Sequence, residues 1–259
     1  MYLIDQSEDD LSSWIKDEIK FPGETRKGKR GSTAKRIQEW LSLHGHQIAV
    51  DGDFGGVTAQ ALEGFQKAKN LSTTGVMDLA THTALVKPMR DVLAHKPKAG
   101  TGFSAAVMSV AKAHLKAHPR EVGGANKGPW VRMYMQGNEG KPWAWCAGFT
   151  TFCMHQASDA GAGPVPIKGS FSCDTLAAQA KNAGVYLPEK KATPENVPAG
   201  SMFLVRRTLT DWTHVGFVSG ANSAAFATVE GNTNDDGDRE GYEVCARSRG
   251  YTKKDFIVL

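Results

Sequence analysis

Apolar positions with helical spacing predict three helices in the first third of the chain. The first starts with Ser32 or Thr33 as its cap, and a turn-rich segment separates it from a second helix that Thr58 opens. Asp78 caps a third, short helix. We expect it to stop before Pro88, because proline disfavours helical backbone in the residue before it. The pattern therefore predicts a small helical unit near the N-terminus.

A second pattern begins near Phe103. Helical spacing of apolar residues returns there and again over residues 147–157. Short apolar runs follow at 202–206, 214–219 and 226–232, and their length and composition are typical of strands. Helices followed by strands indicate an α+β fold in which the helices pack against an antiparallel sheet.

The segment between these two patterns contains few apolar residues. Residues 88–102 hold prolines, lysines and glycines, which indicate a semi-extended linker. We therefore expect four parts: an N-terminal extension at 1–30, a helical module at 31–87, the linker at 88–102, and a larger domain at 103–259.

Composition limits the classes of function. The chain has 259 residues, 41% of them hydrophobic, which is enough to bury one large or two modest cores. The formal charge of +4 is a weak imbalance. It suits an anionic target but carries little weight, and we expect a monomer with no nucleic-acid partner.

No apolar stretch approaches the roughly 18 residues of a membrane span, and the acidic N-terminus does not resemble an export signal. We therefore expect synthesis in the cytoplasm, followed by release or delivery.

The candidate chemistry centres on Cys146, just before the predicted helix at 147–157. A thiol at a helix N-terminus ionises readily because the helix dipole stabilises the thiolate. His214 lies in a predicted strand, and Glu230 and Asn232 share one face of the next. In a cysteine-nucleophile site, the histidine removes the thiol proton and a polar side chain on its other ring nitrogen fixes its tautomer. Glu230 and Asn232 are both candidates for that last role.

The other three cysteines have a simpler interpretation. Four cysteines are too few for a disulfide framework in a chain of this length. We expect the remaining ones to be buried as small apolar residues, with a Cys153–Cys173 bridge as the alternative: Cys153, Cys173 and Cys245.

Two further patterns suggest metal sites. Residues 232–237, with Glu243, approximate a calcium loop of the Asn-x-Asn-x-Asp-Gly type, but strand-like flanks favour a hairpin turn, with calcium binding as the alternative. His44 and His46 lack a second ligand pair at a zinc spacing. We therefore expect no metal and no cofactor.

Glycines, caps and apolar positions in the helical module follow a specific order. The motifs are Ile37-Gln38-x-x-Leu41, Asp51-Gly52-x-Phe54-Gly55-x-x-Thr58, Ala61-Leu62-x-x-Phe65-Gln66 and Thr74-Gly75-x-x-Asp78-x-x-Thr81-x-x-x-Leu85. Over about residues 31–87 this order resembles the three-helix peptidoglycan-binding module found beside many cell-wall hydrolases. The resemblance implies that glycan and stem peptide bind in a shallow groove near Asp51, Phe54, Gly55 and Thr58. The alternative is that these residues only shape a turn and cap a helix.

The larger domain carries three motifs in order: Trp143-x-Trp145-Cys146-Ala147-x-Phe149, His214-Val215-Gly216 and Glu230-Gly231-Asn232. From about Phe103 to Leu259 it resembles the CHAP family of cysteine-dependent amidases and peptidases, which have a papain-like fold. The resemblance implies Cys146 as nucleophile, His214 as general base and acid, Glu230 as the orienting residue, and Asn232 as an auxiliary polar group.

Residues around the nucleophile are candidates for substrate binding. The backbone amide of Cys146 is the natural first donor to an oxyanion, and Asn126, in the irregular loop before it, is the best candidate to line the groove. Trp145 is a candidate aromatic wall, together with Trp130 and Trp143, although core packing is at least as common for tryptophan.

These resemblances imply a peptidoglycan hydrolase that cleaves an amide bond. That bond is either the N-acetylmuramoyl-L-alanine amide or one within the peptide stem or cross-bridge. The expected setting is a phage endolysin or a secreted antibacterial effector. Two rivals are a non-catalytic wall-binding or tail-associated structural protein, and an acyl transferase that uses the same acyl-enzyme.

Overall fold

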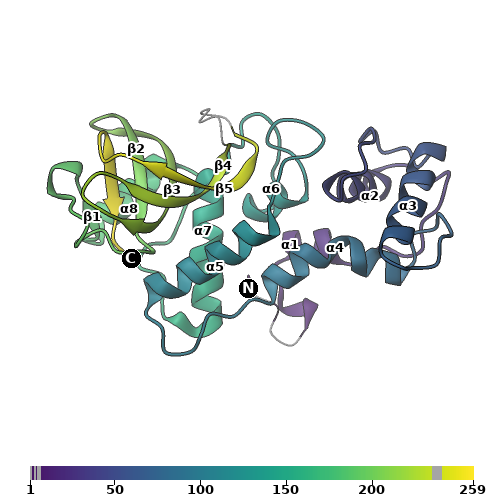
Figure 1. Ribbon diagram of the computed structural model, residues 1–259, viewed down its shortest axis with the longest axis horizontal. Coiled ribbons are helices and arrows are strands. Elements are labelled where there is room, and N and C mark those ends of the chain that lie inside the picture. Colours follow the sequence, from purple (N-terminus) through teal and green to yellow (C-terminus); the bar gives the residue numbers. More distant parts are fainter. Residues whose placement is uncertain (1, 3, 5–6, 235–240) are drawn as a thin grey trace.

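The computed structural model describes residues 2, 4, 7–234 and 241–259, and within them the chain is an α+β protein (Figure 1). The α-helices are α1 (Ser13–Ile19), α2 (Ser32–Leu43), α3 (Gly56–Ala68), α4 (Leu79–Leu93), α5 (Phe103–Ala117), α6 (Pro129–Tyr134), α7 (Cys146–Ala157) and α8 (Cys173–Asn182). The strands are β1 (Tyr186–Leu187), β2 (Met202–Thr208), β3 (Asp211–Ala221), β4 (Phe226–Thr233), β5 (Glu243–Arg249) and β6 (Lys254–Ile257). The predicted fold class is confirmed.

Two buried glutamines organise the helical module in the same way. The side-chain amide of Gln38 in α2 donates to the Thr58 hydroxyl at 3.1 Å, and that of Gln66 in α3 donates to the Thr81 hydroxyl at 3.0 Å. Each glutamine carbonyl also accepts a backbone N–H from the turn that leads to the next helix. Because buried polar groups need such partners, each glutamine fixes the turn that follows its own helix.

The helix starts match the sequence predictions only in part. Asp78 caps α4 as predicted, since its carboxylate accepts the Thr81 N–H at 2.8 Å. The predicted caps of α2 are wrong, because that helix starts at Ser32 itself and Gly31 precedes it without a side-chain cap. Helix α3 likewise starts at Gly56. Thr58 therefore lies inside this helix, where its hydroxyl accepts a hydrogen bond from Gln38.

The prediction that α4 stops before Pro88 is also wrong, because the helix continues to Leu93. Proline removes one helical hydrogen bond. The turn after it buries Met89, Val92 and Leu93, whose apolar contacts offset that loss. The predicted linker at 88–102 is therefore helical over its first residues.

The sheet has the order β1-β6-β2-β3-β4-β5, and its neighbouring strands are antiparallel. Helices α7 and α8 pack on β3, α7 also packs on β4, and α5 packs on α7. Figure 1 shows the sheet at one end of the long axis, with α2 and α3 at the other. The three predicted strands are confirmed, and each is longer than expected.

Contact between α7 and β4 is close enough to require a glycine. A Cβ at Gly231 would lie 2.8 Å from the Phe149 side chain and 2.9 Å from the Trp145 ring. Real side chains do not approach so closely, so a larger residue would push β4 away from the helix. Gly231 therefore sets the distance between the start of α7 and the strand that carries Glu230.

A buried ion cluster joins the helical module to the second domain. Arg132 in α6 donates to Glu18 of α1 at 2.8 Å, to Glu39 of α2 at 2.6 Å, and to Glu139 at 2.6 Å. The side chains of Glu18 and Glu39 are at most 1% exposed. The two domains are thus held by direct contacts as well as by the connecting segment.

Candidate functional site

Cys146 lies at the N-terminus of α7, as predicted, but it is the first residue of the helix, which starts one residue earlier than expected; only 6% of its surface is exposed. Asn232 of β4 holds the start of this helix. Its side-chain carbonyl accepts the backbone N–H of Trp145 at 2.6 Å, and its amide donates to the Gly241 carbonyl at 2.9 Å. Asn232 therefore positions the residue before Cys146 rather than the histidine.

His214 of β3 is paired with Glu230 of β4. Its Nε2 lies 2.8 Å from a Glu230 carboxylate oxygen, and both side chains are buried. The structure thus selects Glu230 over Asn232 as the partner of His214. Because Nε2 is occupied, Nδ1 is the ring atom left for the hydrogen bond with Cys146.

Glu230 is itself held by three further hydrogen bonds. Thr228 donates its hydroxyl at 2.6 Å, and Arg249 of β5 donates through Nε at 2.6 Å and Nη2 at 2.5 Å. Burial raises the pKa of Glu230, but the hydrogen bonds from Arg249 and His214 outweigh it and hold the pKa at about 2. The carboxylate is therefore ionised at neutral pH.

The strand that carries His214 needs a glycine two residues later. A Cβ at Gly216 would lie 2.9 Å from the Cγ of Glu230 and 2.8 Å from the Phe203 ring. The glycine in the His-Val-Gly motif therefore leaves room for the glutamate that orients the histidine.

Cys146 also interacts with a second thiol, that of Cys173 at the start of α8. A hydrogen bond with Cys173 lowers the pKa of Cys146 most; burial opposes it, and His214 and the Val215 backbone amide lower it further. The same hydrogen bond and burial raise the pKa of Cys173, so the proton of this pair stays on Cys173. All four cysteines are free, and the alternative Cys153–Cys173 bridge is absent.

The histidine is charged opposite the thiolate. Burial lowers the pKa of His214, but its hydrogen bonds with Cys146 and Glu230 outweigh this and raise the pKa to about 9. The lowered pKa of Cys146 and the raised pKa of His214 therefore favour the thiolate–imidazolium form of the pair. This arrangement provides a nucleophile and a proton donor on adjacent side chains.

Sequence reasoning missed two partners of this site. Arg249 and Cys173 carry no local motif, and each reaches the site from a separate element, β5 and α8. Their contribution depends on the antiparallel pairing of β4 with β5 and on the packing of α8 against β3.

The prediction that Trp145 forms an aromatic wall is wrong. Its side chain is fully buried, stacks on Tyr134 at 5.5 Å between ring centroids, and donates its ring N–H to Glu121 at 2.9 Å. Trp130 is buried as well. A ring packed on all sides supports the start of α7 but cannot contact a substrate. Trp143, partly exposed, packs edge-on against Phe171.

Asn126 lies in the same supporting loop. Its backbone N–H donates to Glu121 at 2.8 Å and its side-chain amide donates to the Lys141 carbonyl at 3.4 Å. Its side-chain oxygen is buried without a partner among the described residues. The role of Asn126 in a substrate groove stays a prediction.

The helical module has a recognisable architecture, with three helices and two turns fixed by Gln38 and Gln66. Residues 30–85 match the family model described as "Putative peptidoglycan binding domain". The match supports a wall-binding module in this segment, here named the peptidoglycan-binding domain. The match fits a cell-wall-associated protein whose partner is peptidoglycan. No curated protein matches the chain.

Two of the four residues expected to contact the polymer in the peptidoglycan-binding domain cannot do so. Phe54 is fully buried in the core, and Thr58 is 3% exposed and accepts a hydrogen bond from Gln38, so both have structural roles. Asp51 is exposed, although one of its carboxylate oxygens accepts Gln38 and the Asp53 N–H, each at 2.8 Å. For Asp51 and the partly exposed Gly55, contact with the polymer stays a prediction.

The metal patterns receive no structural support. Asp236 and Gly237 of the calcium-like loop lie outside the described residues. Elsewhere along the described chain, no three His, Cys, Asp or Glu side chains are grouped to hold a metal ion. His44 bonds the Leu85 carbonyl through Nε2 at 2.8 Å. None of the described helices combines the length and the apolar character needed to cross a membrane.

Proposed function

We propose that this chain hydrolyses an amide bond of peptidoglycan, with Cys146 as nucleophile, His214 as general acid and base, and Glu230 as the residue that orients His214. The observation that carries the proposal is the buried His214–Glu230 pair next to Cys146 at the start of α7, in a chain that also matches a peptidoglycan-binding domain. The motif order and the helix-on-sheet arrangement support a CHAP-type, papain-like enzyme.

The first half of the reaction forms an acyl-enzyme. The Cys146 thiolate attacks the amide carbonyl carbon, and the carbonyl electrons move to its oxygen. The Cys146 backbone N–H has no partner within α7 because it belongs to the first helical turn, so it is free to stabilise that oxyanion. His214 Nδ1 then gives its proton to the nitrogen as the C–N bond breaks, which leaves a thioester and a free amine.

The second half regenerates the enzyme. Neutral His214 removes a proton from water, the hydroxide adds to the thioester carbonyl, and the C–S bond breaks to release a carboxylate. Throughout both steps Glu230 keeps its hydrogen bond to Nε2 and stabilises the imidazolium, and Arg249 holds Glu230 in place.

Digestion of purified peptidoglycan tests this function. We expect new primary amines in equal number to new carboxylates, no new reducing sugar ends, and fragment masses that identify either the lactyl amide or a peptide bond of the stem. A constant amine count accompanied by amine-exchanged fragments would show an acyl transferase instead. Unchanged peptidoglycan would show a wall-binding protein without activity.

The pH dependence of hydrolysis should follow His214. Because its proton is needed for the leaving amine, we expect kcat/KM to fall as the pH rises through about 9, the pKa of His214. Glu230→Gln removes a negative charge that raises this pKa, so the alkaline limb should move to lower pH. Initial rates of amine release from pH 5 to 10.5 give the position of the alkaline limb for the unmodified chain and for Glu230→Gln.

Glu243→Gln is the matched control, since Glu243 bonds His118 rather than His214. It should leave the alkaline limb in place. An alkaline limb that stays at the same pH in Glu230→Gln would contradict the role given to Glu230.

A further inference from the structure

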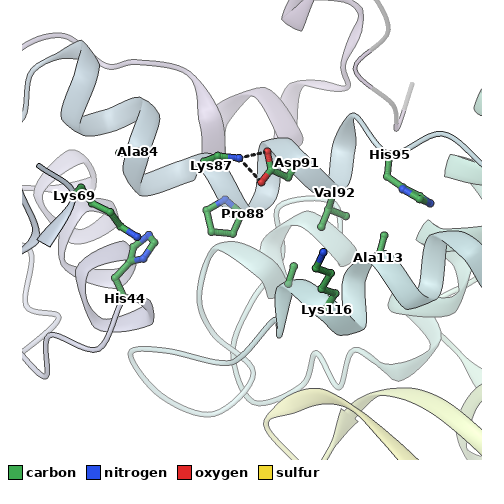
Figure 2. Close-up of a pocket in the computed structure, with 11 residues that line it drawn as sticks. His44, Lys69, Ala84, Lys87, Pro88, Asp91, Val92, His95, Ala113 and Lys116 are labelled. Carbon is green, nitrogen blue, oxygen red and sulfur yellow. Dashed lines mark hydrogen bonds and ion pairs between the residues drawn. The ribbon is translucent and has the colours of Figure 1, made fainter. Parts of the chain in front are cut away.

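A cavity of about 450 Å³ lies where the peptidoglycan-binding domain meets the second domain (Figure 2). Its walls come from the C-terminal ends of α2 and α3, from α4, and from α5. None of Cys146, His214 and Glu230 lines it. The cavity is therefore a separate place at which a ligand can contact both domains at once.

Lysines dominate the charge of this cavity. Lys87 binds both carboxylate oxygens of Asp91, at 2.7 and 2.6 Å, so these two charges neutralise each other. Lys69 and Lys116 have no carboxylate partner within the part of the chain that the structure describes. They approach the cavity from opposite domains, as Figure 2 shows, and leave it with excess positive charge.

Two histidines line the cavity as hydrogen-bonding groups rather than as charges. His44 bonds the Leu85 carbonyl, and burial lowers its pKa despite that bond. His95 bonds the Ser109 hydroxyl at 2.9 Å, and burial lowers its pKa as well. The excess positive charge at neutral pH therefore comes from the lysines alone.

The remaining lining is apolar and helical. Ala84, Pro88 and Val92 of α4 and Ala113 of α5 provide it, and Val92 is further fixed because its carbonyl accepts the Gln156 amide at 2.6 Å. A ligand that fits both the lining and the charge has anionic groups on short aliphatic segments. The stem peptide of peptidoglycan has this chemistry, since it joins small residues such as alanine to residues with free carboxylates.

We propose that this cavity binds the acidic stem peptide of peptidoglycan, with Lys69 and Lys116 contacting its carboxylates. The site lies at the boundary of the domain that matches the peptidoglycan-binding family, so the polymer that reaches that domain also reaches the cavity. The inference rests on peptidoglycan being the bound polymer, as in the proposed function, but it does not require cleavage.

Binding of a free stem tripeptide, L-Ala-γ-D-Glu-meso-diaminopimelate, to the full chain tests the site. We expect Lys69→Gln combined with Lys116→Gln to weaken binding roughly fivefold to tenfold, the effect of two exposed charge contacts. A tripeptide with amidated carboxyl groups should bind weakly to both proteins. In NMR titrations, the amide signals of Ala84 and Ala113 should shift with the acidic tripeptide, which locates it in the cavity.

The matched control combines Lys67→Gln with Lys112→Gln. It removes the same charge from α3 and α5, but at exposed lysines outside the cavity, and it should bind the tripeptide as the unmodified chain does. Equal losses in both double variants, or unchanged binding in the first, would overturn the proposal. If the Lys69 and Lys116 double variant bound oligomeric glycerol phosphate more weakly than the unmodified chain does, but bound the tripeptide equally well, the proposal would be overturned in favour of a phosphate polymer. Hydrolysis of sacculi is measured separately, so an inactive chain that still binds the tripeptide contradicts only the proposed function.

Discussion

Cys146→Ala is expected to abolish amide hydrolysis of peptidoglycan while leaving binding to sacculi unchanged. Removing a nucleophile that works with a histidine lowers kcat by roughly 10⁴- to 10⁶-fold. The alanine keeps α7 intact because the Trp145 N–H still bonds Asn232, and the binding domain lies on other elements. Amine release and co-sedimentation with sacculi measure the two properties on the same sample.

Cys153→Ala is the matched control for this experiment. Cys153 lies in the same helix and is fully buried, but burial alone raises its pKa and no partner lowers it. This variant should lose stability through a small cavity and keep its activity per folded molecule. Equal hydrolysis by Cys146→Ala and the unmodified chain would rule out the cysteine mechanism.

Arg132→Met is expected to destabilise the folded chain by about 3–5 kcal/mol, the usual cost of breaking a buried ion cluster by removing one partner. Methionine fills much of the volume but removes the buried cation shared by Glu18 and Glu39. These carboxylates then keep only the more exposed Arg36, at 3.3 Å, and Lys35, at 3.5 Å. Because these carboxylates belong to α1 and α2, the contact between the two domains should loosen first. Urea unfolding followed by circular dichroism gives the free energy of unfolding.

Arg36→Gln is the control for Arg132→Met. Arg36 also contacts Glu18, at 3.3 Å, but its side chain is 36% exposed, so solvent screens the pair. We expect a loss below about 1 kcal/mol. A similar loss in the two variants would show that the cluster does not join the domains as the structure indicates.

The sequence predicted those helices and strands whose positions depend on the spacing of apolar residues nearby in the chain. Apolar spacing located α5, α7 and the strands β2, β3 and β4, and the helix-start position of Cys146 followed from where that spacing begins. The end of α4 was missed because a rule about Pro88 considers its neighbours only. The apolar contacts of Leu93 and the turn before it decide where the helix ends.

Long-range partners could not be read from the sequence. Glu18 and Arg132 are 114 residues apart, and no motif connects them. Asn232 and Glu230 looked equivalent on one strand face, yet one bonds the Trp145 backbone and the other bonds His214. The choice between them depends on how α7 crosses β4, which a single sequence does not encode in a local pattern.

The helix that continues through Pro88 has a consequence for how a polymer is processed. Helix α4 forms part of the peptidoglycan-binding domain and also packs on α5, while the Arg132 cluster joins α2 to α6. The separation between a docked strand and Cys146 is then set by the fold rather than by a flexible connection. With the proposed activity, the amide bond that reaches Cys146 would lie at a fixed distance from the docked segment of the polymer.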